Sequence, residues 1–293
     1  MLENEVAPMF VDQPLEVQRA TLDAMGRDAQ MPPALLVEQG MIGELPVEWL
    51  RGPNSENRVV VYAHGGGYVM GSCDSHRPLA GRLALACQAQ VVMPQFRLAP
   101  EHPFPAPLED LMATYRSLFE LGYTADQIIL AGDSAGGGLV LATVLEAQRL
   151  GLPTPRAMVM LSPWVDMTLS GESLVTHAER DPWLDPSTFP LIRELYLSDA
   201  DPSNPLASPL LGDLSALPPT LVQVGSDEIL VSDSLNFGAR ASEAGSTVDI
   251  EVWDHMWHVW HFFAPMLPEA NAALDSISSF IESVFAPRLR DCG

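Results

Sequence analysis

The amino-acid sequence predicts an α/β protein with a mostly parallel sheet flanked by helices. The first observation is that apolar, strand-like stretches alternate with helical stretches four times between residues 58 and 164. This alternation is typical of βαβ units. The second is the continuous apolar run that opens residues 58–67, as expected of a strand buried on both faces. The third is length, because 293 residues suffice for one large α/β domain or two small ones.

The predicted elements follow one another along the chain. Residues 1–33 form a helical segment, since residues 14–25 carry apolar side chains at helical spacing. Two short extended stretches, residues 34–40 and 45–52, form a predicted hairpin. Further strands are expected at residues 58–67, 89–96, 126–132, 156–164, 220–230 and 247–254. Further helices are expected at residues 75–88, 106–122, 134–151, 186–198, 232–245 and 271–285.

The alternation of strands and helices is interrupted by an insertion. Residues 168–218 are rich in proline and turn formers and contain one helical patch. In open α/β sheets, an insertion after a central strand lies over the carboxyl edge, where ligands bind. We therefore expect residues 168–218 to lie beside a functional site.

The charge and the choice of basic residue exclude several classes of function. Acidic residues outnumber basic ones by 38 to 15, and the formal charge is −23. This disfavours nucleic acid and anionic membrane as partners, because both attract basic surface. All 15 basic residues are arginine. The lack of lysine excludes Schiff-base catalysis, P-loop nucleotide binding and protein-kinase activity.

The cysteines and the first residues indicate the compartment. Cys73, Cys87 and Cys292 form neither a disulfide framework nor a CxxC pair. The opening stretch MLENEVAPMF lacks the basic and apolar regions of a signal peptide. No apolar run approaches the ~20 residues of a membrane span. We therefore expect a protein of the reducing cytoplasm without a membrane span.

A serine lies in a glycine-rich turn in the middle of the chain. Gly132–Gly136, within LAGDSAGGGL, has the pattern G-x-S-x-G between a predicted strand and a predicted helix. This context is typical of a nucleophile elbow, a strained turn in which only small neighbours fit. The alternative, a phosphate-binding loop, is disfavoured because neither G-x-G-x-x-G nor a lysine is present there. Ser134 is therefore the candidate nucleophile.

A second glycine-rich motif, HGGGY, covers residues 64–68 at the end of a predicted strand. Attack of a serine on an ester carbonyl makes an oxyanion, which needs backbone N–H donors that can approach closely. Gly65, Gly66 and Gly67 are the candidate donors on one side, and Ala135 supplies the donor after the nucleophile. The alternative is a plain glycine turn, but the two motifs together favour an oxyanion hole.

The acid of the site is expected after the serine and before the base. Asp227 follows a predicted strand directly and is the favoured acid, with Glu228 and Asp233 as alternatives. Asp227 is favoured because its turn comes straight after the strand.

The base is expected among three histidines in DHMWHVWHFF. His258 is favoured because it lies in the loop after the last strand, whereas His255 is close to the strand and His261 begins the next helix. The spacing of three also permits a zinc site. No fixed carboxylate or cysteine ligand set accompanies it, so we expect no metal.

Other residues near these motifs have supporting roles. His64 lies in the wrong place to be the base and is expected to order the glycine loop through hydrogen bonds. Asp133, next to the nucleophile, is a further supporting residue. Arg97 and Glu101 are expected to form a buried ion pair that braces the elbow.

Six motifs together are typical of a known family. They are HGGG, FRLAPEHPFPAPLEDL, GDSAGGG, SNPLASPL, VGSDEILVSD and MWHVWH. With these, the chain resembles the hormone-sensitive lipase family of α/β-hydrolases, in its bacterial esterase branch. The resemblance implies an α/β-hydrolase fold with a helical cap, and a triad of Ser134, Asp227 and His258. Phe96 departs from the tyrosine common in YRLAPE, away from the proposed chemistry.

The resemblance also implies a domain organisation and a substrate class. The cap would comprise residues 1–45 and 168–218, and the catalytic domain residues 46–167 and 219–293. Short- to medium-chain carboxylic esters are the expected small-molecule substrates, and no cofactor is required. A homodimer stays open.

Two alternative functions and one set of pocket residues remain. A lactone hydrolase would use the same triad. A non-catalytic ligand-binding homologue is disfavoured, because related plant hormone receptors depart from the triad at the histidine and His258 is present here. The candidate pocket residues are Tyr68, Trp183, Phe189 and Tyr196. Their alternative role is to pack the cap onto the catalytic domain.

Overall fold

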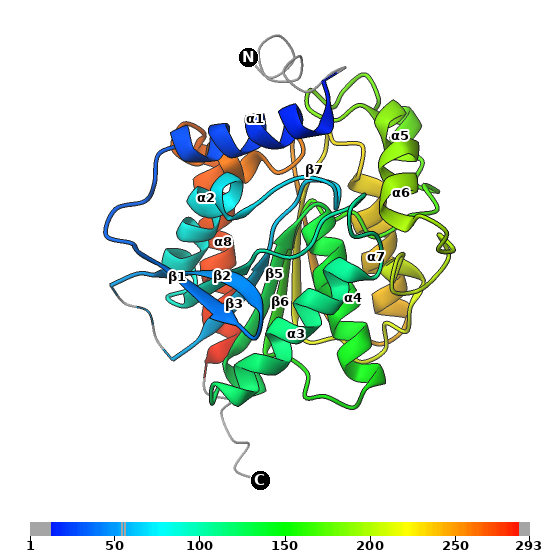
Figure 1. The fold of residues 1–293 in the computed structure, drawn as a ribbon. Coiled ribbons are helices and arrows are strands. Elements are labelled where there is room, and N and C mark those ends of the chain that lie inside the picture. Colours follow the sequence, from blue (N-terminus) through cyan, green and yellow to red (C-terminus); the bar gives the residue numbers. More distant parts are fainter. Residues whose placement is uncertain (1–12, 54, 56, 287–293) are drawn as a thin grey trace.

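An eight-stranded sheet forms the centre of the computed structural model, which describes residues 13–53, 55 and 57–286 (Figure 1). The strands are β1 Leu36–Ile42, β2 Leu45–Arg51, β3 Val59–Ala63, β4 Gln90–Pro94, β5 Ile128–Asp133, β6 Ala157–Leu161, β7 Thr220–Gly225 and β8 Val248–Trp253. Their order in the sheet is β1-β2-β4-β3-β5-β6-β7-β8. β2 pairs antiparallel with β1 and β4, and the other neighbouring strands pair in parallel. The predicted mostly parallel sheet is confirmed.

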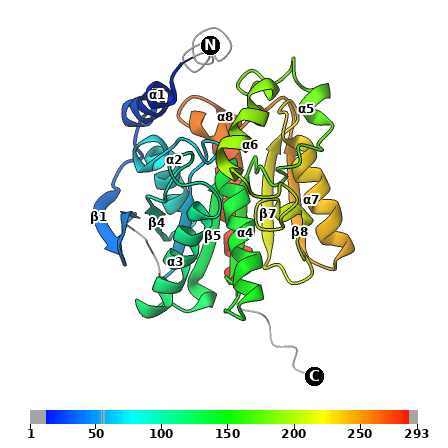
Figure 2. The ribbon, with the colours of Figure 1, turned by 45° about the vertical axis from the view of Figure 1, so that its right-hand side comes forward.

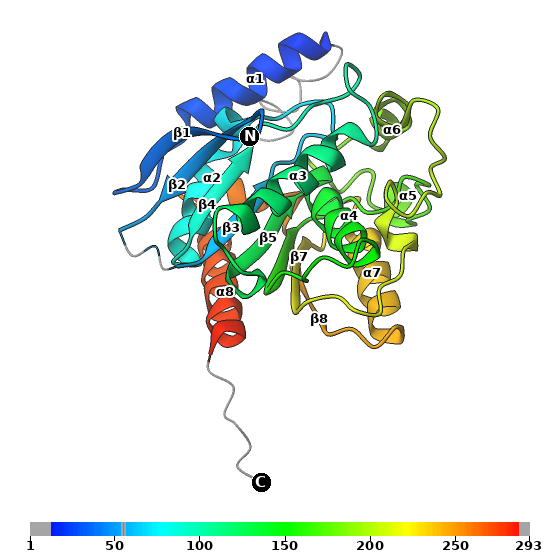
Figure 3. The same ribbon diagram turned by 60° about the horizontal axis from the view of Figure 1, so that its bottom comes forward.

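Helices cover both faces of this sheet. They are α1 Leu15–Asp28, α2 Cys73–Ala86, α3 Ala106–Glu120, α4 Ala135–Arg149, α5 Ser173–Thr176, α6 Phe189–Leu197, α7 Val231–Glu243 and α8 Pro268–Phe285. Short 3-10 turns are η3 Ala125–Gln127, η4 Pro186–Thr188, η5 Pro209–Leu211 and η6 Trp260–Phe263. Helices α3, α4 and α7 pack on one face, and α2 and α8 on the other (Figures 2 and 3).

The central strands are buried on both faces, as their apolar runs predict. In β3, Val59 and Val61 belong to the core beneath α3 and α4. Val60 and Tyr62 belong to the core beneath α2 and α8. Successive side chains of a strand point to opposite faces, so a strand between two helical layers must be apolar at every position.

The insertion lies at the edge of the sheet where the central strands end. Between β6 and β7 the chain forms α5, η4, α6 and η5, and α5 and α6 lie at the same end of the sheet as α1 (Figures 1 and 2). The N-terminal helix is tied down there by Arg19, whose guanidinium donates to the carbonyl oxygens of Val69 at 2.7 Å and Ala99 at 2.9 Å. The insertion and the N-terminal helix thus lie at the sheet edge where the site is expected.

One predicted boundary and one predicted contact differ from the structure. The hairpin of β1 and β2 belongs to the sheet, so the cap boundary at residue 45 falls inside the hairpin; residues 1–12 of that segment lie outside the described residues. The predicted Arg97–Glu101 pair does not form. Arg97 lies 2.8 Å from Asp110, and Glu101 pairs with Arg19 at 2.8 Å. Arg19 of α1 thus pairs with Glu101, the carboxylate that the short spacing in the sequence had assigned to Arg97.

None of the helices in the described part of the chain combines the length and the apolar character needed to cross a bilayer.

Candidate active site

Ser134 forms the turn between β5 and α4. Its backbone has φ 52° and ψ −123°, an unfavourable conformation for a residue with a Cβ, and such strain is concentrated at functional turns. The amide of Ser134 donates to the carbonyl of Leu161 at 2.9 Å, and its carbonyl accepts from Trp164 N–H at 2.9 Å. These two bonds fix the turn to the end of β6. Ser134 itself is partly accessible, whereas Asp133 and Ala135 on either side are buried.

Two glycines next to the turn are required by close packing. A Cβ on Gly132 would lie 2.6 Å from the carbonyl carbon of Gly136. A Cβ on Gly136 would lie 2.6 Å from the carbonyl carbon of Ala63. Helix α4 therefore begins in direct backbone contact with the end of β3, as expected for a nucleophile elbow.

The HGGG loop leaves the end of β3 beside this elbow, because Ala63 pairs with Gly132 across the two strands. Gly66 and Gly67 have φ values of 109° and 63°, and both are partly accessible. Their N–H groups donate to no acceptor within the described part of the chain. The N–H of Gly65 differs, since it donates to Asp133 Oδ1 at 3.0 Å. Gly65 therefore anchors the loop instead of supplying a free donor, which corrects its predicted role.

Asp133 is the anchor of that loop. Its buried carboxylate accepts from Tyr62 O–H at 2.5 Å as well as from Gly65 N–H, and lies 3.3 Å from His76 Nε2. Burial disfavours the charged form, but the charge of His76 and the hydrogen bonds from His76 and Tyr62 outweigh it and lower the pKa of Asp133. Asp133, the residue before the nucleophile, is therefore ionised, and its carboxylate holds the glycine loop in place through Gly65.

His64 supports the same loop from its other side. Its ring stacks on Phe96 at 4.1 Å, and Nδ1 lies 2.8 Å from the carbonyl oxygen of Gly65. Burial, with the nearby His76, lowers the pKa of His64 to about 3. The neutral ring therefore carries its proton on Nδ1 and donates it to Gly65. This geometry agrees with the loop-ordering role predicted for His64.

Among the three histidines of DHMWHVWHFF, His258 is the one with a buried carboxylate partner. Its Nδ1 lies 2.7 Å from Oε2 of Glu228, and both side chains are buried. The other oxygen of Glu228 accepts from the N–H of Gly225, the last residue of β7, at 2.7 Å. Burial lowers the pKa of His258, but the hydrogen bond and charge of Glu228 outweigh it, so the pKa is raised. Burial is the main cause of the raised pKa of Glu228.

Asp227, the predicted acid, does not occupy this position. Its Oδ1 lies 2.5 Å from Arg180 Nη2 of the cap, and its Oδ2 is 3.7 Å from His255 Nδ1. Adjacent residues of the turn after β7 point in different directions, Asp227 toward the cap surface and Glu228 toward the interior. The structure therefore replaces Asp227 by Glu228 as the partner of His258.

The remaining candidates for the acid and the base have different surroundings. Asp233 accepts from the backbone N–H groups of Val165 at 3.0 Å and Asp166 at 3.1 Å, and burial raises its pKa to about 8. His255 is 87% exposed. His261 is buried with Nε2 2.9 Å from Gln223 Oε1, and burial lowers its pKa to about 3.

The end of β6 connects the serine turn to the histidine loop. Ser162 follows β6 directly, and its Oγ accepts from the N–H of Val259, the residue after His258, at 3.0 Å. The preceding residue, Leu161, accepts the N–H of Ser134. Consecutive residues at the end of β6 thus hold the candidate nucleophile and the candidate base at the same sheet edge. Sequence reasoning missed Ser162, because its partner is 97 residues away.

A family model described as the alpha/beta hydrolase fold matches residues 60–262. The chain belongs to this family. A crystal structure of an esterase from the bacterial hormone-sensitive lipase family is 43% identical, with a TM-score of 0.90 and 92% coverage of both chains. This enzyme is thus a hormone-sensitive lipase family member, as the motifs predict.

Relatives with named activities agree with this membership. The acetyl-hydrolase of Streptomyces hygroscopicus is 41% identical over 249 residues, which are 85% of this chain and 83% of that protein. An esterase of Acinetobacter venetianus is 34% identical over 267 residues, 91% of this chain and 88% of that protein. An esterase/lipase from an uncultured bacterium is 40% identical with a TM-score of 0.91, covering 97% of this chain and 95% of the other. The hydrolase described here is a carboxylic ester hydrolase.

The predicted pocket residues divide into two groups. Tyr68 stacks on Tyr196 of α6 at 3.7 Å, and Phe189 packs on Trp164 at 4.6 Å. All four rings are buried, so they pack the cap onto the catalytic domain, which was the alternative role. Trp183 is only partly buried. It remains the candidate for a pocket wall.

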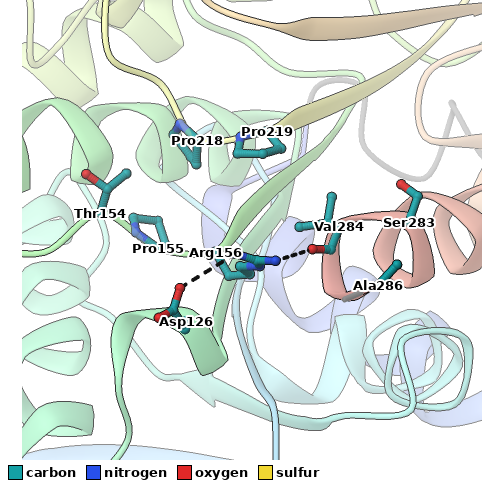
Figure 4. A pocket seen from close by; sticks show the side chains of 9 residues that line it. All are labelled: Asp126, Thr154, Pro155, Arg156, Pro218, Pro219, Ser283, Val284 and Ala286. Carbon is teal, nitrogen blue, oxygen red and sulfur yellow. Dashed lines mark hydrogen bonds and ion pairs between the residues drawn. The ribbon is translucent and has the colours of Figure 1, made fainter. Parts of the chain in front are cut away.

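A separate cavity of about 360 Å³ lies at the opposite edge of the sheet, where β5, β6 and β7 begin (Figure 4). Arg156 points into the space between η3 and α8, where it donates to the carbonyl of Val284 and lies 3.7 Å from Asp126. The guanidinium of Arg156 therefore already interacts with groups of the enzyme itself. This cavity takes no part in the site at the carboxyl edge.

Proposed function

We propose that this hydrolase cleaves short- to medium-chain carboxylic esters through an acyl-enzyme on Ser134, with His258 as base and Glu228 as acid. The observation that carries the proposal is the 2.7 Å contact between His258 Nδ1 and the buried Glu228, at the sheet edge that also holds the strained Ser134. A carboxylate on Nδ1 keeps the proton there, which leaves Nε2 as the acceptor for the serine proton.

The first half-reaction is acylation. His258 takes the proton of Ser134 as its Oγ attacks the ester carbonyl, and Glu228 stabilises the resulting imidazolium. The alcohol then leaves with a proton from His258. In the second half-reaction His258 activates a water molecule that hydrolyses the acyl-enzyme.

Backbone donors stabilise the oxyanion in both half-reactions. Gly66, Gly67 and Ala135 are the proposed donors, because their N–H groups have no acceptor within the described part of the chain. A donor of this kind is worth about 3 kcal/mol of transition-state stabilisation. Asp133 and His64 support the site by fixing Gly65, from which the donor residues follow.

The chain length of the acyl group is proposed from two observations. The relative from Streptomyces hygroscopicus is named an acetyl-hydrolase, which points to small acyl groups. Tyr68, directly after the HGGG loop, stacks on Tyr196 of α6, and we propose that these two buried rings limit the room for a long acyl chain. The cytoplasm stays the expected compartment, and a homodimer stays open.

A panel of p-nitrophenyl esters from acetate to palmitate tests the proposal. The wild-type enzyme should turn over the acetate and butyrate fastest. Ser134→Ala should lower kcat by about 10⁶-fold, because residues of a triad act as a unit. Ser279→Ala, which removes an exposed hydroxyl of α8 away from the site, is the control and should keep the wild-type turnover. Full activity in folded Ser134→Ala would overturn the proposed nucleophile.

A further inference from the structure

The cap segment around α5 is hydrogen-bonded to the turn that carries Glu228. Ser173 Oγ donates to the carbonyl of Ile229 at 2.5 Å and accepts from Ser232 N–H at 3.0 Å. Ser173 N–H in turn donates to Ser232 Oγ at 3.0 Å. All three residues are buried. The cap is thus joined to the acid turn by a closed set of hydrogen bonds.

Asp181 makes the most direct of these connections. Its Oδ2 accepts from Ile229 N–H at 3.0 Å. Its Oδ1 accepts from the N–H groups of Trp183 at 2.9 Å and Leu184 at 3.0 Å within the cap. The N–H of Ile229 belongs to the peptide group that joins it to Glu228. Asp181 therefore holds the backbone of Glu228 itself.

The side chain of Asp181 is buried and only 9% exposed. Burying a carboxylate is costly unless hydrogen bonds or opposite charges compensate, and here three backbone N–H groups do so. The neighbouring Arg180 points away to Asp227 on the surface, at 2.5 Å. Asp181 thus caps the turn at Trp183 and Leu184 and at the same time reaches Ile229 outside the cap.

Asp181 also acts electrostatically on the pair of Glu228 and His258. Its negative charge favours the protonated form of His258 and contributes to the raised pKa of that ring. Titratable groups that act on this ring are Glu228 after β7, Asp181 in the cap, Asp133 at the end of β5 and His261 in η6. Of the three carboxylates, Asp181 is the one that the cap supplies.

We propose that Asp181 is a positioning residue, through which the cap fixes the Glu228–Ile229 peptide and so holds Glu228 against His258. The cap is then part of the catalytic machinery as well as a cover for the site. This inference rests on the proposed role of Glu228 as the catalytic acid.

Asp181→Asn in the purified full-length enzyme tests the proposal. Asparagine keeps the size of the side chain but has no charge and only one acceptor oxygen. Either the N–H of Ile229 or the N–H groups of Trp183 and Leu184 therefore lose their acceptor. We expect kcat for p-nitrophenyl acetate to fall about 10- to 100-fold, which corresponds to one buried donor left unpaired. KM should change less than about twofold, because Asp181 does not bind substrate. The acid limb of the pH profile of kcat/KM should move to lower pH, because His258 loses a nearby negative charge.

Asp185→Asn is the matched control. Asp185 is an exposed aspartate of the same cap segment and accepts from Ser187 N–H at 2.8 Å. This variant makes the same charge change without touching the acid turn. We expect unchanged kcat and an unchanged acid limb. A purely structural role of Asp181 would lower only the melting temperature and leave kcat of the folded variant unchanged.

Two further variants separate the possible outcomes. If Asp181→Asn does not fold, Ser173→Ala tests the same connection without a charge change, and it should lower kcat at constant KM. Unchanged kcat in folded Asp181→Asn, or in Ser173→Ala if the first variant does not fold, overturns the inference. Glu228→Gln distinguishes failure of the inference about Asp181 from failure of the proposed function. Full activity there removes Glu228 as the acid, whereas an inactive Glu228→Gln beside a fully active Asp181→Asn overturns only the role of Asp181.

Discussion

Replacing Glu228 by glutamine should remove most of the activity, whereas replacing the adjacent Asp227 by asparagine should not. Glu228 uses both carboxylate oxygens, one on Gly225 N–H and one on His258 Nδ1, each at 2.7 Å. A glutamine has only one oxygen to offer. If that oxygen stays on Gly225, the amide N–H₂ faces Nδ1 and forces the imidazole proton onto Nε2.

The size of the effect follows from these two orientations. With the proton on Nε2, His258 cannot accept the serine proton, and such a tautomer error costs about 10⁴-fold in kcat. With the amide reversed, the buried N–H of Gly225 loses its acceptor, which costs about 1–3 kcal/mol of stability. We therefore expect Glu228→Gln to lower kcat by about 10³- to 10⁴-fold with KM nearly unchanged.

Asp227→Asn is the paired measurement. The pair of Asp227 and Arg180 is half-exposed on the cap side, and such pairs contribute about 0–1 kcal/mol to stability. We expect kcat within about twofold of the wild-type value. The assay is steady-state hydrolysis of p-nitrophenyl acetate by both variants, with circular dichroism to confirm that each is folded. A severe loss in Asp227→Asn together with an active Glu228→Gln would refute the assignment of the acid.

Two further predictions concern the pH dependence and the oxyanion hole. The pKa of His258 is raised, and the base must be neutral to act. Activity should therefore fall as the pH decreases, with a midpoint in kcat/KM above the ordinary histidine value of about 6.5; a midpoint well below that value would contradict the contact with Glu228. Gly66→Ala should lower kcat about 10²- to 10³-fold, because the backbone at φ 109° must shift and take its N–H from the oxyanion. Gly122→Ala, at φ 93° on the surface, is the control for glycine loss and should keep its kcat while losing a little stability.

The order of elements could be predicted from the sequence because each element has a local signal. The strand at β3 is apolar at every position, since α2 and α3 cover opposite faces, and α4 begins at a turn of small residues. The predicted boundary at residue 45 separates β1 from β2, because β1 mixes apolar and polar residues, is mostly exposed, and so has no core pattern that marks it as part of the sheet. Its place in the sheet depends on pairing with β2, which local patterning does not reveal.

The order of residues along the chain was not sufficient to choose between Asp227 and Glu228 as the acid. Both follow β7, and both satisfy the order serine, acid, histidine. A signal was nevertheless present, because Glu228 directly precedes the apolar run Ile229–Val231, which enters the core, whereas Asp227 follows Ser226 in the accessible part of the turn. The side chain next to the buried run was the one more apt to face inward.

Contacts between distant segments had no sequence signal at all. Asp133 anchors the HGGG loop with Tyr62, which is 71 residues away. Asp181 reaches Ile229 across 48 residues. Tyr196, expected in the pocket, is buried against Tyr68 because α6 folds back onto the HGGG loop. Such partners depend on tertiary packing, which short-range patterns do not encode.

Peptide mapping after inhibition by a fluorophosphonate identifies the nucleophilic serine directly. Such a reagent phosphonylates a serine that is activated by a histidine, and the product resists hydrolysis. We expect one equivalent of adduct on the peptide that contains Ser134, in proportion to the activity lost, and none in His258→Ala. Complete inactivation with the adduct on a different residue, or with Ser134 unmodified, would contradict it.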